Sequence, residues 1–268
     1  QIAAQSTPLP LPAPKASSDI TGSIAPRATP SRQEATRSDA TRSPAAPDSL
    51  PASIGPTLRM AVAAHDPAAE YELATRYAEG RGMPQDLNEA LHWLQRSADA
   101  GFVPAQFRLG SLNEKGEGIK KDLPTARRLY LAAARKGHAK AMHNLAVLYA
   151  EGIDGKPDYA AAADWFRKAA NHGVTDSQFN LAILYARGIG VPSDLAAAYR
   201  WFTLAAAKGD ADAARKRDQV ASQLDQYTLA SAKRAAQSFV PEREPDEATN
   251  LRVPPGGWDR AATAQSRP

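Results

Sequence analysis

The stretch LAILYARGIGVPSDLAAAYRWFTLAAAKG, residues 181–209, contains two helical patterns separated by a short glycine-containing turn. Apolar residues recur at three- and four-residue spacing in both halves, which is typical of amphipathic helices. Asp194 stands where an N-cap oxygen is needed at the start of the second helix. Gly209 stands where a left-handed residue ends a helix. The stretch therefore predicts a helix–turn–helix unit.

This unit recurs along the chain with a step of 36 residues. Leucine, aspartate, alanine and glycine keep this step at Leu73, Leu109, Leu145 and Leu181; Asp86, Asp122, Asp158 and Asp194; Ala90, Ala126, Ala162 and Ala198; and Gly101, Gly137, Gly173 and Gly209. The pairs expected to pack between units are Trp93-Leu94, Leu129-Tyr130, Trp165-Phe166 and Trp201-Phe202. A step that holds over four units predicts a solenoid.

The Gly188-Ile189-Gly190 loop before a helix is compatible with a phosphate-binding loop. The equivalent segments, however, read GRGMPQD (80–86), GEGIKKD (116–122) and GIDGKPD (152–158). A solenoid needs a turn in every unit, whereas a phosphate site has no reason to recur there. We therefore interpret the loop as a helix-to-helix turn.

The pattern LxxxYxxGxGxxxDxxxAxxW(F/Y)xxAAxxG, seen best in 181–209 and also in 73–101, resembles the Sel1-like repeat, a relative of the tetratricopeptide repeat. The resemblance covers about 65–209. It implies an all-α fold, a right-handed α-solenoid of four 36-residue helix-turn-helix repeats with helical caps. The repeats are expected at about 66–101, 102–137, 138–173 and 174–209. Asn113 and Leu129 replace the Tyr and Trp of the other repeats and predict a looser seam in the second one.

The ordered domain is expected over 57–239, with caps at 57–65 and 210–239. Residues 1–56 contain ten of the 21 prolines and no aromatic residue, so we predict a disordered linker there, with a PxxP ligand as the alternative. Residues 240–268 are predicted to be a second linker. In that linker Trp258 is either a docking anchor or, as we prefer, a loosely packed tail residue. Both flanks are expected to be dispensable for folding.

Composition narrows the functional classes. The 268 residues include no cysteine, which excludes disulfides, thiolate metal sites and a cysteine nucleophile. With 33 Lys and Arg against 29 Asp and Glu, the net charge is +4 without a basic block, so nucleic acid is not an expected partner. No apolar run is long enough to span a membrane. We expect the chain to be part of a longer protein, with any targeting segment upstream.

A narrower resemblance concerns the order of segments. A Pro-rich region, the repeats, the segment 210–225 and the PPGGWDR tail (254–260) look like the PodJ-type polar localisation factors of alphaproteobacteria. The resemblance implies a periplasmic location, with the chain tethered to the inner membrane by an upstream segment, and allows a link to peptidoglycan.

No catalytic, cofactor or metal site is predicted. His138 and His143 are five residues apart and would face different sides of a helix, which makes a poor metal pair. His143 occupies the place of Tyr71, Phe107 and Phe179, so we expect it to pack in the core or form a groove wall. The recurring aspartates are explained as helix caps.

The remaining candidate is a concave surface, which in helical-hairpin solenoids is lined by the first helix of each repeat. Residues at i, i+3 and i+7 share a helix face, so three rows are expected to form one strip. The rows are Glu72, Arg108, Asn144 and Asn180; Thr75, Ser111, Val147 and Ile183; and Glu79, Lys115, Glu151 and Arg187. From the strip and its edge, the predicted partner-binding residues are Glu72, Arg108, Lys115, His143, Asn144, Asn180 and Arg187.

Two functions fit this surface. The first is a non-catalytic protein–protein interaction scaffold that binds a protein or peptide in the concave groove. The second is a peptidoglycan-binding module. The scaffold is preferred because sugar sites usually need exposed aromatic residues, and the aromatic residues here stand at packing positions. A solvated face that binds nothing is the remaining alternative.

Overall fold

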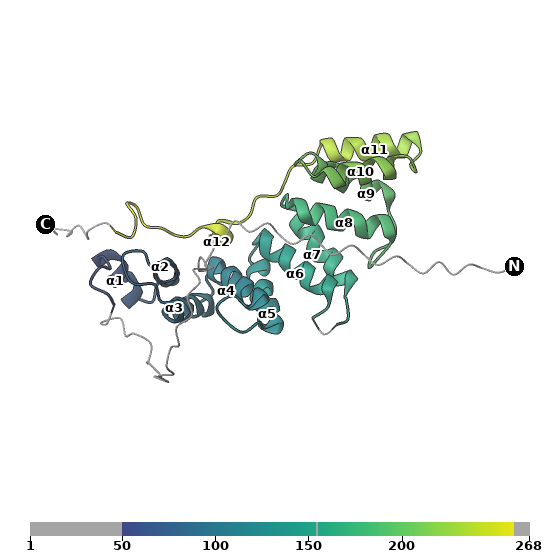
Figure 1. The fold of residues 1–268 in the computed structure, drawn as a ribbon. Helices are drawn as coiled ribbons and strands as arrows, with labels where there is room; N and C mark the ends of the chain where they lie inside the picture. Colours follow the sequence, from purple (N-terminus) through teal and green to yellow (C-terminus); the bar gives the residue numbers. More distant parts are fainter. Residues whose placement is uncertain (1–49, 154, 260–268) are drawn as a thin grey trace, which may run out of the picture. The chain divides into compact units, whose positions relative to one another are not determined.

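The structure of the protein is a computed structural model that describes residues 50–153 and 155–259. In these residues every regular element is a helix (Figure 1). The helices are α1 (Pro56–Ala63), α2 (Pro67–Glu79), α3 (Leu87–Asp99), α4 (Val103–Lys115), α5 (Leu123–Arg135), α6 (Ala139–Glu151), α7 (Tyr159–Asn171), α8 (Thr175–Arg187), α9 (Leu195–Ala206), α10 (Ala211–Ala221), α11 (Gln226–Gln237) and α12 (Asp246–Thr249). Most of the predicted N-terminal linker, residues 1–49, and residues 260–268 lie outside the described residues.

The four helical hairpins α2–α3, α4–α5, α6–α7 and α8–α9 confirm the predicted all-α repeats. Each second helix is capped by the recurring aspartate: the Asp86 and Asp194 carboxylates, for example, accept from the backbone N–H groups of Asn88 and Ala197. The GIG loop is a turn, as predicted. Gly188 ends α8 with φ of 66°, a conformation that carries little steric cost only for glycine.

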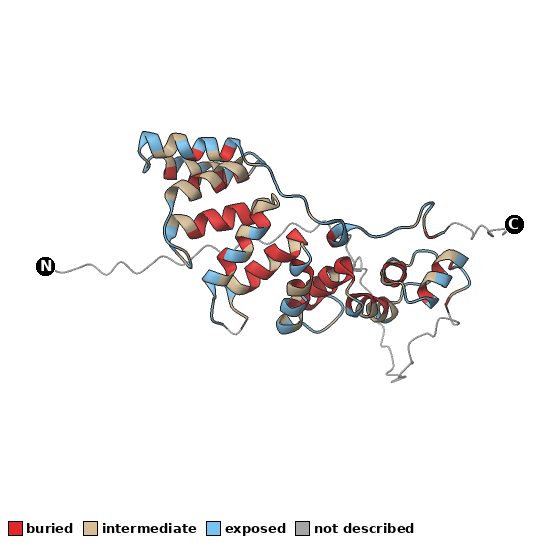
Figure 2. Cartoon of the chain, turned by 180° about the vertical axis from the view of Figure 1, so that it is seen from behind, coloured by how far each residue is buried: buried red, intermediate tan, exposed pale blue. Residues whose placement is uncertain are grey.

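The chain divides into two compact units. Among the described residues, one unit comprises 50–141 with 244–259 and the other comprises 142–243, so that the boundary lies inside α6. Trp93 and Leu73 lie in the core of the first unit, and Phe166 and Phe202 in the core of the second. Figure 2 shows the buried residues along the inner sides of the helices of each unit.

The second repeat is not loosely packed at the positions that the sequence indicated. Asn113 is buried and donates from Nδ2 to the carbonyl oxygen of Leu109 at 2.8 Å, and Leu129 is buried as well. The adjacent Tyr130 ring fills the space beside Gly110, where a Cβ atom would lie 2.8 Å from the ring. The buried Leu129 and Tyr130 therefore fill this part of the second repeat.

In the third repeat the tryptophan is less buried than the sequence predicted. Trp165 is only partly buried, and the ammonium of Lys168 lies 3.8 Å from its ring centroid. Its neighbour Phe166 is fully buried instead. The residue that fills this part of the core is therefore Phe166, whereas Trp93 and Trp201 are buried as predicted.

Helices outside the repeats cover the two ends of the array, as predicted. Leu58 and Val62 of α1 are buried in the core of the first unit. In the second unit α10 and α11 lie against α9, with Val220 buried and Phe239 packed edge-on to Trp201. A terminal repeat needs such a cover over its apolar face.

The predicted C-terminal linker needs correction for residues 240–259, which pack on the repeats. In the first unit Glu244 accepts from the backbone N–H of Ala139 at 3.1 Å, Pro245 lies beside Gly137, and α12 lies next to α4. In the second unit the Glu242 N–H donates to the carbonyl oxygen of Asn171 at 2.9 Å. The prolines suit this role because an extended chain on a surface does not require their N–H groups.

Trp258 is a docking anchor rather than a loose tail residue. Its side chain lies in the core of the first unit with Leu50 and Ile54, and the residue is 7% exposed. Leu50 and Ile54 also belong to the predicted N-terminal linker, whose last residues are therefore part of the fold. Gly55 lies beside this segment, because a Cβ built on it would be in van der Waals contact with the carbonyl oxygen of Trp258 at 3.7 Å.

Candidate functional site

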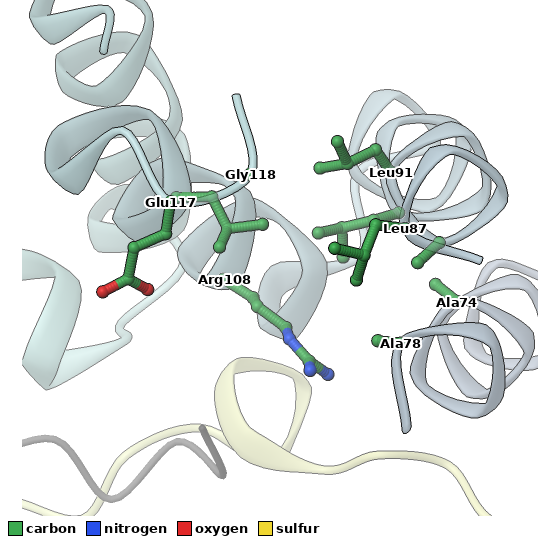
Figure 3. A pocket seen from close by; sticks show the side chains of 10 residues that line it. Ala74, Ala78, Leu87, Leu91, Arg108, Glu117 and Gly118 are labelled. Carbon is green, nitrogen blue, oxygen red and sulfur yellow. The ribbon is translucent and has the colours of Figure 1, made fainter. Parts of the chain in front are cut away.

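An apolar pocket of about 240 Å³ lies between the first two repeats (Figure 3). Helices α2, α3 and α4 and the turn after α4 form its walls. The lining residues are Ala74, Ala78, Leu87, Ala90, Leu91, Leu94, Arg108, Leu112, Glu117 and Gly118. The walls are thus aliphatic, with one guanidinium and one carboxylate among the lining residues.

In the turn of the second repeat Ile119 packs against the core of its unit, whereas Glu117 and Gly118 line the pocket. A Cβ on Gly118 would meet no atom within 4 Å, whereas a Cβ on the equivalent Gly190 would collide with the backbone of Tyr159. One residue earlier, the second repeat has the exposed Glu117 where the fourth has Ile189, which packs on the core of its unit. An isoleucine draws its turn onto the neighbouring helix, while a carboxylate resists burial.

Arg108 is the predicted site residue that lines this pocket. Its Nη1 donates to Thr75 Oγ1 at 2.9 Å, and the guanidinium carbon lies 5.8 Å from the ring centroid of Tyr71. These contacts hold the side chain in place without neutralising its charge. Within the described part of the chain, no carboxylate is paired with Arg108.

The other charged residues predicted to bind a partner do not line the pocket. Glu72 accepts from Arg76 Nε at 2.8 Å and pairs with Arg81 at 3.1 Å, so its carboxylate is already neutralised. Lys115 and Arg187 are exposed at the C-terminal ends of α4 and α8.

His143 has to be removed from the predicted partner-binding set, because its side chain is 0% exposed. Its Nδ1 lies 2.7 Å from Ser177 Oγ, and its ring packs against Phe166. This is the packing role that its aromatic equivalents indicated. Asn180 is 7% exposed and Asn144 is partly buried, so the two amides present little surface.

The middle row of the predicted strip is largely buried. Ser111, Val147 and Ile183 are all buried, and the last two belong to the core of the second unit. The first helices of the repeats therefore do not present the continuous polar strip that helical spacing predicted. The reason is that residues on one face of a helix are still covered when neighbouring helices pack closely over them.

The pocket residues Leu87, Leu91 and Glu117 were not predicted from the sequence. A signal was present, because Leu91 aligns with Arg127, Ala163 and Tyr199 at the 36-residue step. The side chain at this position therefore differs in size and charge from one repeat to the next, and so does the space that it fills.

The titratable side chains of residues 50–153 and 155–259 do not gather into a metal site. In the described residues no three His, Asp or Glu side chains gather in a way that could hold a metal ion. Burial, with a smaller contribution from Lys140, lowers the pKa of His138 to about 4. His138 Nδ1 accepts from the Ala141 N–H at 3.1 Å and so caps the start of α6. Among the described helices, none combines the length and apolar character needed to cross a bilayer.

Comparison with known families matches the Sel1 repeat to residues 67–102, 103–138, 139–174 and 175–210. A protective antigen present in uropathogenic Escherichia coli strains, displaying an SLR fold, is 31% identical with a TM-score of 0.58; the match covers 68% of this chain and 40% of the antigen. A Sel1 repeat protein from Oxalobacter formigenes is 35% identical with a TM-score of 0.55. This match covers 61% of this chain and 47% of the Oxalobacter protein. The chain thus spans less than half the length of either protein. Curated protein sequences give no match.

Proposed function

The chain belongs to the Sel1 repeat family, and we propose that it is a non-catalytic scaffold that binds a partner protein through its repeats. Sel1 repeat proteins generally act as protein–protein interaction scaffolds. The observation that supports a specific partner here is the open apolar pocket with its unpaired Arg108. Closing such a pocket with an apolar group releases water and is favourable, whereas a purely structural seam would be closed already.

The finer role is proposed from the order of segments alone. A Pro-rich region before the repeats and the PPGGWDR tail after them resemble the periplasmic region of polar localisation factors. In that role the chain would position other periplasmic proteins at a cell pole. The structure shows that the tail packs on the repeats, so in this proposal the tail is part of the scaffold.

Peptidoglycan is the alternative ligand. Sugar rings usually bind against exposed aromatic faces, and the ten residues that line the pocket include none. The charged residues at the pocket suit a peptide with its own charges better than a neutral glycan. The protein partner is therefore preferred.

The test is a capture experiment with the whole immobilised chain, offered a periplasmic extract and, separately, purified sacculi. An unrelated helical protein of similar net charge serves as the control bait. We expect a protein that is retained by the chain, is absent from the control, and binds the purified chain in a calorimetric titration. Retention on sacculi without any specific protein partner would replace the proposal with the peptidoglycan alternative.

A further inference from the structure

We propose that the pocket between the first two repeats binds a partner segment in which an aliphatic side chain lies next to a carboxylate. The aliphatic side chain enters between Leu87, Leu91 and Leu112, and the carboxylate binds Arg108. This inference rests on the proposed function, because it assumes a protein partner, and it specifies the chemistry that the partner must present.

The walls of the pocket are aliphatic and come from α2, α3 and α4. Leu87 and Leu91 of α3 are partly exposed although they face an apolar space, and Ala74 and Ala78 of α2 leave room opposite them. A volume of about 240 Å³ exceeds what a single water site requires and suits one or two aliphatic side chains. Apolar walls select an apolar occupant, because a polar group entering there would lose its hydrogen bonds to water.

The guanidinium of Arg108 places a positive charge at the pocket. Arg108 is held by Thr75 and by the Tyr71 ring, and a guanidinium has five N–H donors, so several stay available for a ligand. An oriented guanidinium at the edge of an apolar site favours a carboxylate, which it can bind with two parallel hydrogen bonds. Figure 3 shows the side chains of Arg108 and Glu117 pointing away from one another. The ligand carboxylate is therefore expected on the Arg108 side, away from the like charge of Glu117.

The C-terminal tail of this chain already binds to the repeats through an apolar side chain next to a carboxylate. The tail of this chain docks on the first repeat through an apolar residue followed by an acidic one. Trp258 enters the core, and the Asp259 carboxylate lies 2.7 Å from Arg76 Nη1. Arg108 on α4 and the pocket beside it offer a similar pairing of guanidinium and apolar space.

The test begins with a library of random 12-residue peptides displayed on phage and selected on the whole chain. Selected peptides are expected to carry Leu, Ile, Val or Met within two positions of Asp or Glu. The best peptide is synthesised with a fluorescein label, and its affinity is measured by fluorescence anisotropy.

Three variants use residues that the chain itself carries at equivalent positions. Leu91→Arg takes the residue of Arg127 and fills the pocket with charge, and Glu117→Ile takes that of Ile189 and should draw the turn onto Leu87. Arg108→Asn takes the residue of Asn180 and removes the guanidinium. Each is expected to weaken peptide binding by roughly tenfold or more. The control Arg128→Asn, at an exposed position on α5, should leave the affinity unchanged.

A double-mutant cycle tests the ion pair directly. Replacing the peptide's carboxylate by its amide should weaken binding to the wild-type chain but not to Arg108→Asn. Equal affinity for the wild type, Leu91→Arg and Glu117→Ile would overturn the inference, as would a selection that enriches no peptide on the wild type over Glu117→Ile. If a partner protein is captured but binds the pocket variants as well as the wild type, the scaffold stands and the pocket assignment fails. Circular dichroism of each variant confirms that the helices are intact.

Discussion

Arg76 Nη1 lies 2.7 Å from Asp259 Oδ1, an ion pair that joins the second helix to the C-terminal tail. Leucine occupies the equivalent position in the other three repeats, at Leu112, Leu148 and Leu184. Burial lowers the pKa of Arg76, but hydrogen bonds to Asp259 and Glu72 outweigh it and raise the pKa overall. A guanidinium in a leucine position thus depends on two carboxylates, one of which the tail supplies.

We expect Asp259→Asn to lower the free energy of unfolding by about 1 kcal/mol, which is below the ~1.5–3 kcal/mol of a hydrogen bond to a charged group. The loss stays moderate because Asp259 is 75% exposed and Glu72 remains. Urea melts measure the change. In an Arg76→Leu background, which restores the residue of the other repeats, Asp259→Asn should have no further effect. An equal loss in both backgrounds would mean that the ion pair does not hold the tail.

The tail is expected to contribute to folding, contrary to its composition. Trp258→Ala removes a buried aromatic side chain and should cost roughly 3 kcal/mol. A fragment of residues 57–239 should melt at a lower temperature than the whole chain, because it also lacks Leu50 and Ile54. Calorimetry of both proteins decides this, with Val253→Ala, at an exposed tail position, as the control. A fragment that melts with the whole chain would restore the interpretation of the tail as a linker.

The repeats were predictable because their signals are local and recur four times. An aspartate cap and a left-handed glycine specify each helix boundary from neighbouring residues alone, as at Asp194 and Gly188. The tail was not predictable, because its prolines and charges are those of a linker. Its packing depends on Arg76 and on the core residues Leu50 and Ile54, which lie far away in the sequence.

The candidate site was predictable only in part, for a related reason. Helical spacing places Arg108 correctly on the first helix of its repeat, but it carries no information on how closely the next repeat approaches. Glu117 is exposed and lines the pocket, whereas the equivalent Ile189 packs on the core in the fourth repeat. The helical pattern of the repeat carries no signal for such a difference in a turn.

The tryptophans of the repeats should differ in their effect on stability. Trp93 is 0% exposed and donates from Nε1 to Glu89 at 3.1 Å, so Trp93→Ala should cost roughly 3–5 kcal/mol. Trp165 is partly exposed, so Trp165→Ala should cost clearly less, about 1–2 kcal/mol, in proportion to the smaller area it buries. Urea melts of the two variants are compared under the same conditions. A larger loss for Trp165→Ala would place that ring in the core.

The predicted strip and the pocket can be separated with the partner that the capture experiment yields. Asn144→Ala with Asn180→Ala should change affinity by less than about threefold, because the two amides present little surface. Arg108→Asn with Leu91→Arg should weaken binding by roughly tenfold or more. Calorimetric titration measures both, with Arg167→Ala and Lys208→Ala as the control pair. The opposite ranking would return the binding surface to the two asparagines.

We expect the stability of the protein to fall at acidic pH because of His138. Its neutral ring stacks on Phe107 with centroids 4.5 Å apart and accepts the N–H of Ala141, a hydrogen bond that protonation of Nδ1 would remove. Burial lowers its pKa from 6.5 to about 4, so between these values the unfolded chain binds a proton that the folded chain does not. Stability therefore falls as the pH drops from 6.5 towards 4, by up to about 3 kcal/mol from this residue. The His138→Asn variant keeps a capping side chain but does not titrate, so its loss over this range should be smaller by that amount. Urea melts at pH 7, 6, 5 and 4.5 compare the two proteins, and parallel pH profiles would show that His138 is not the group responsible.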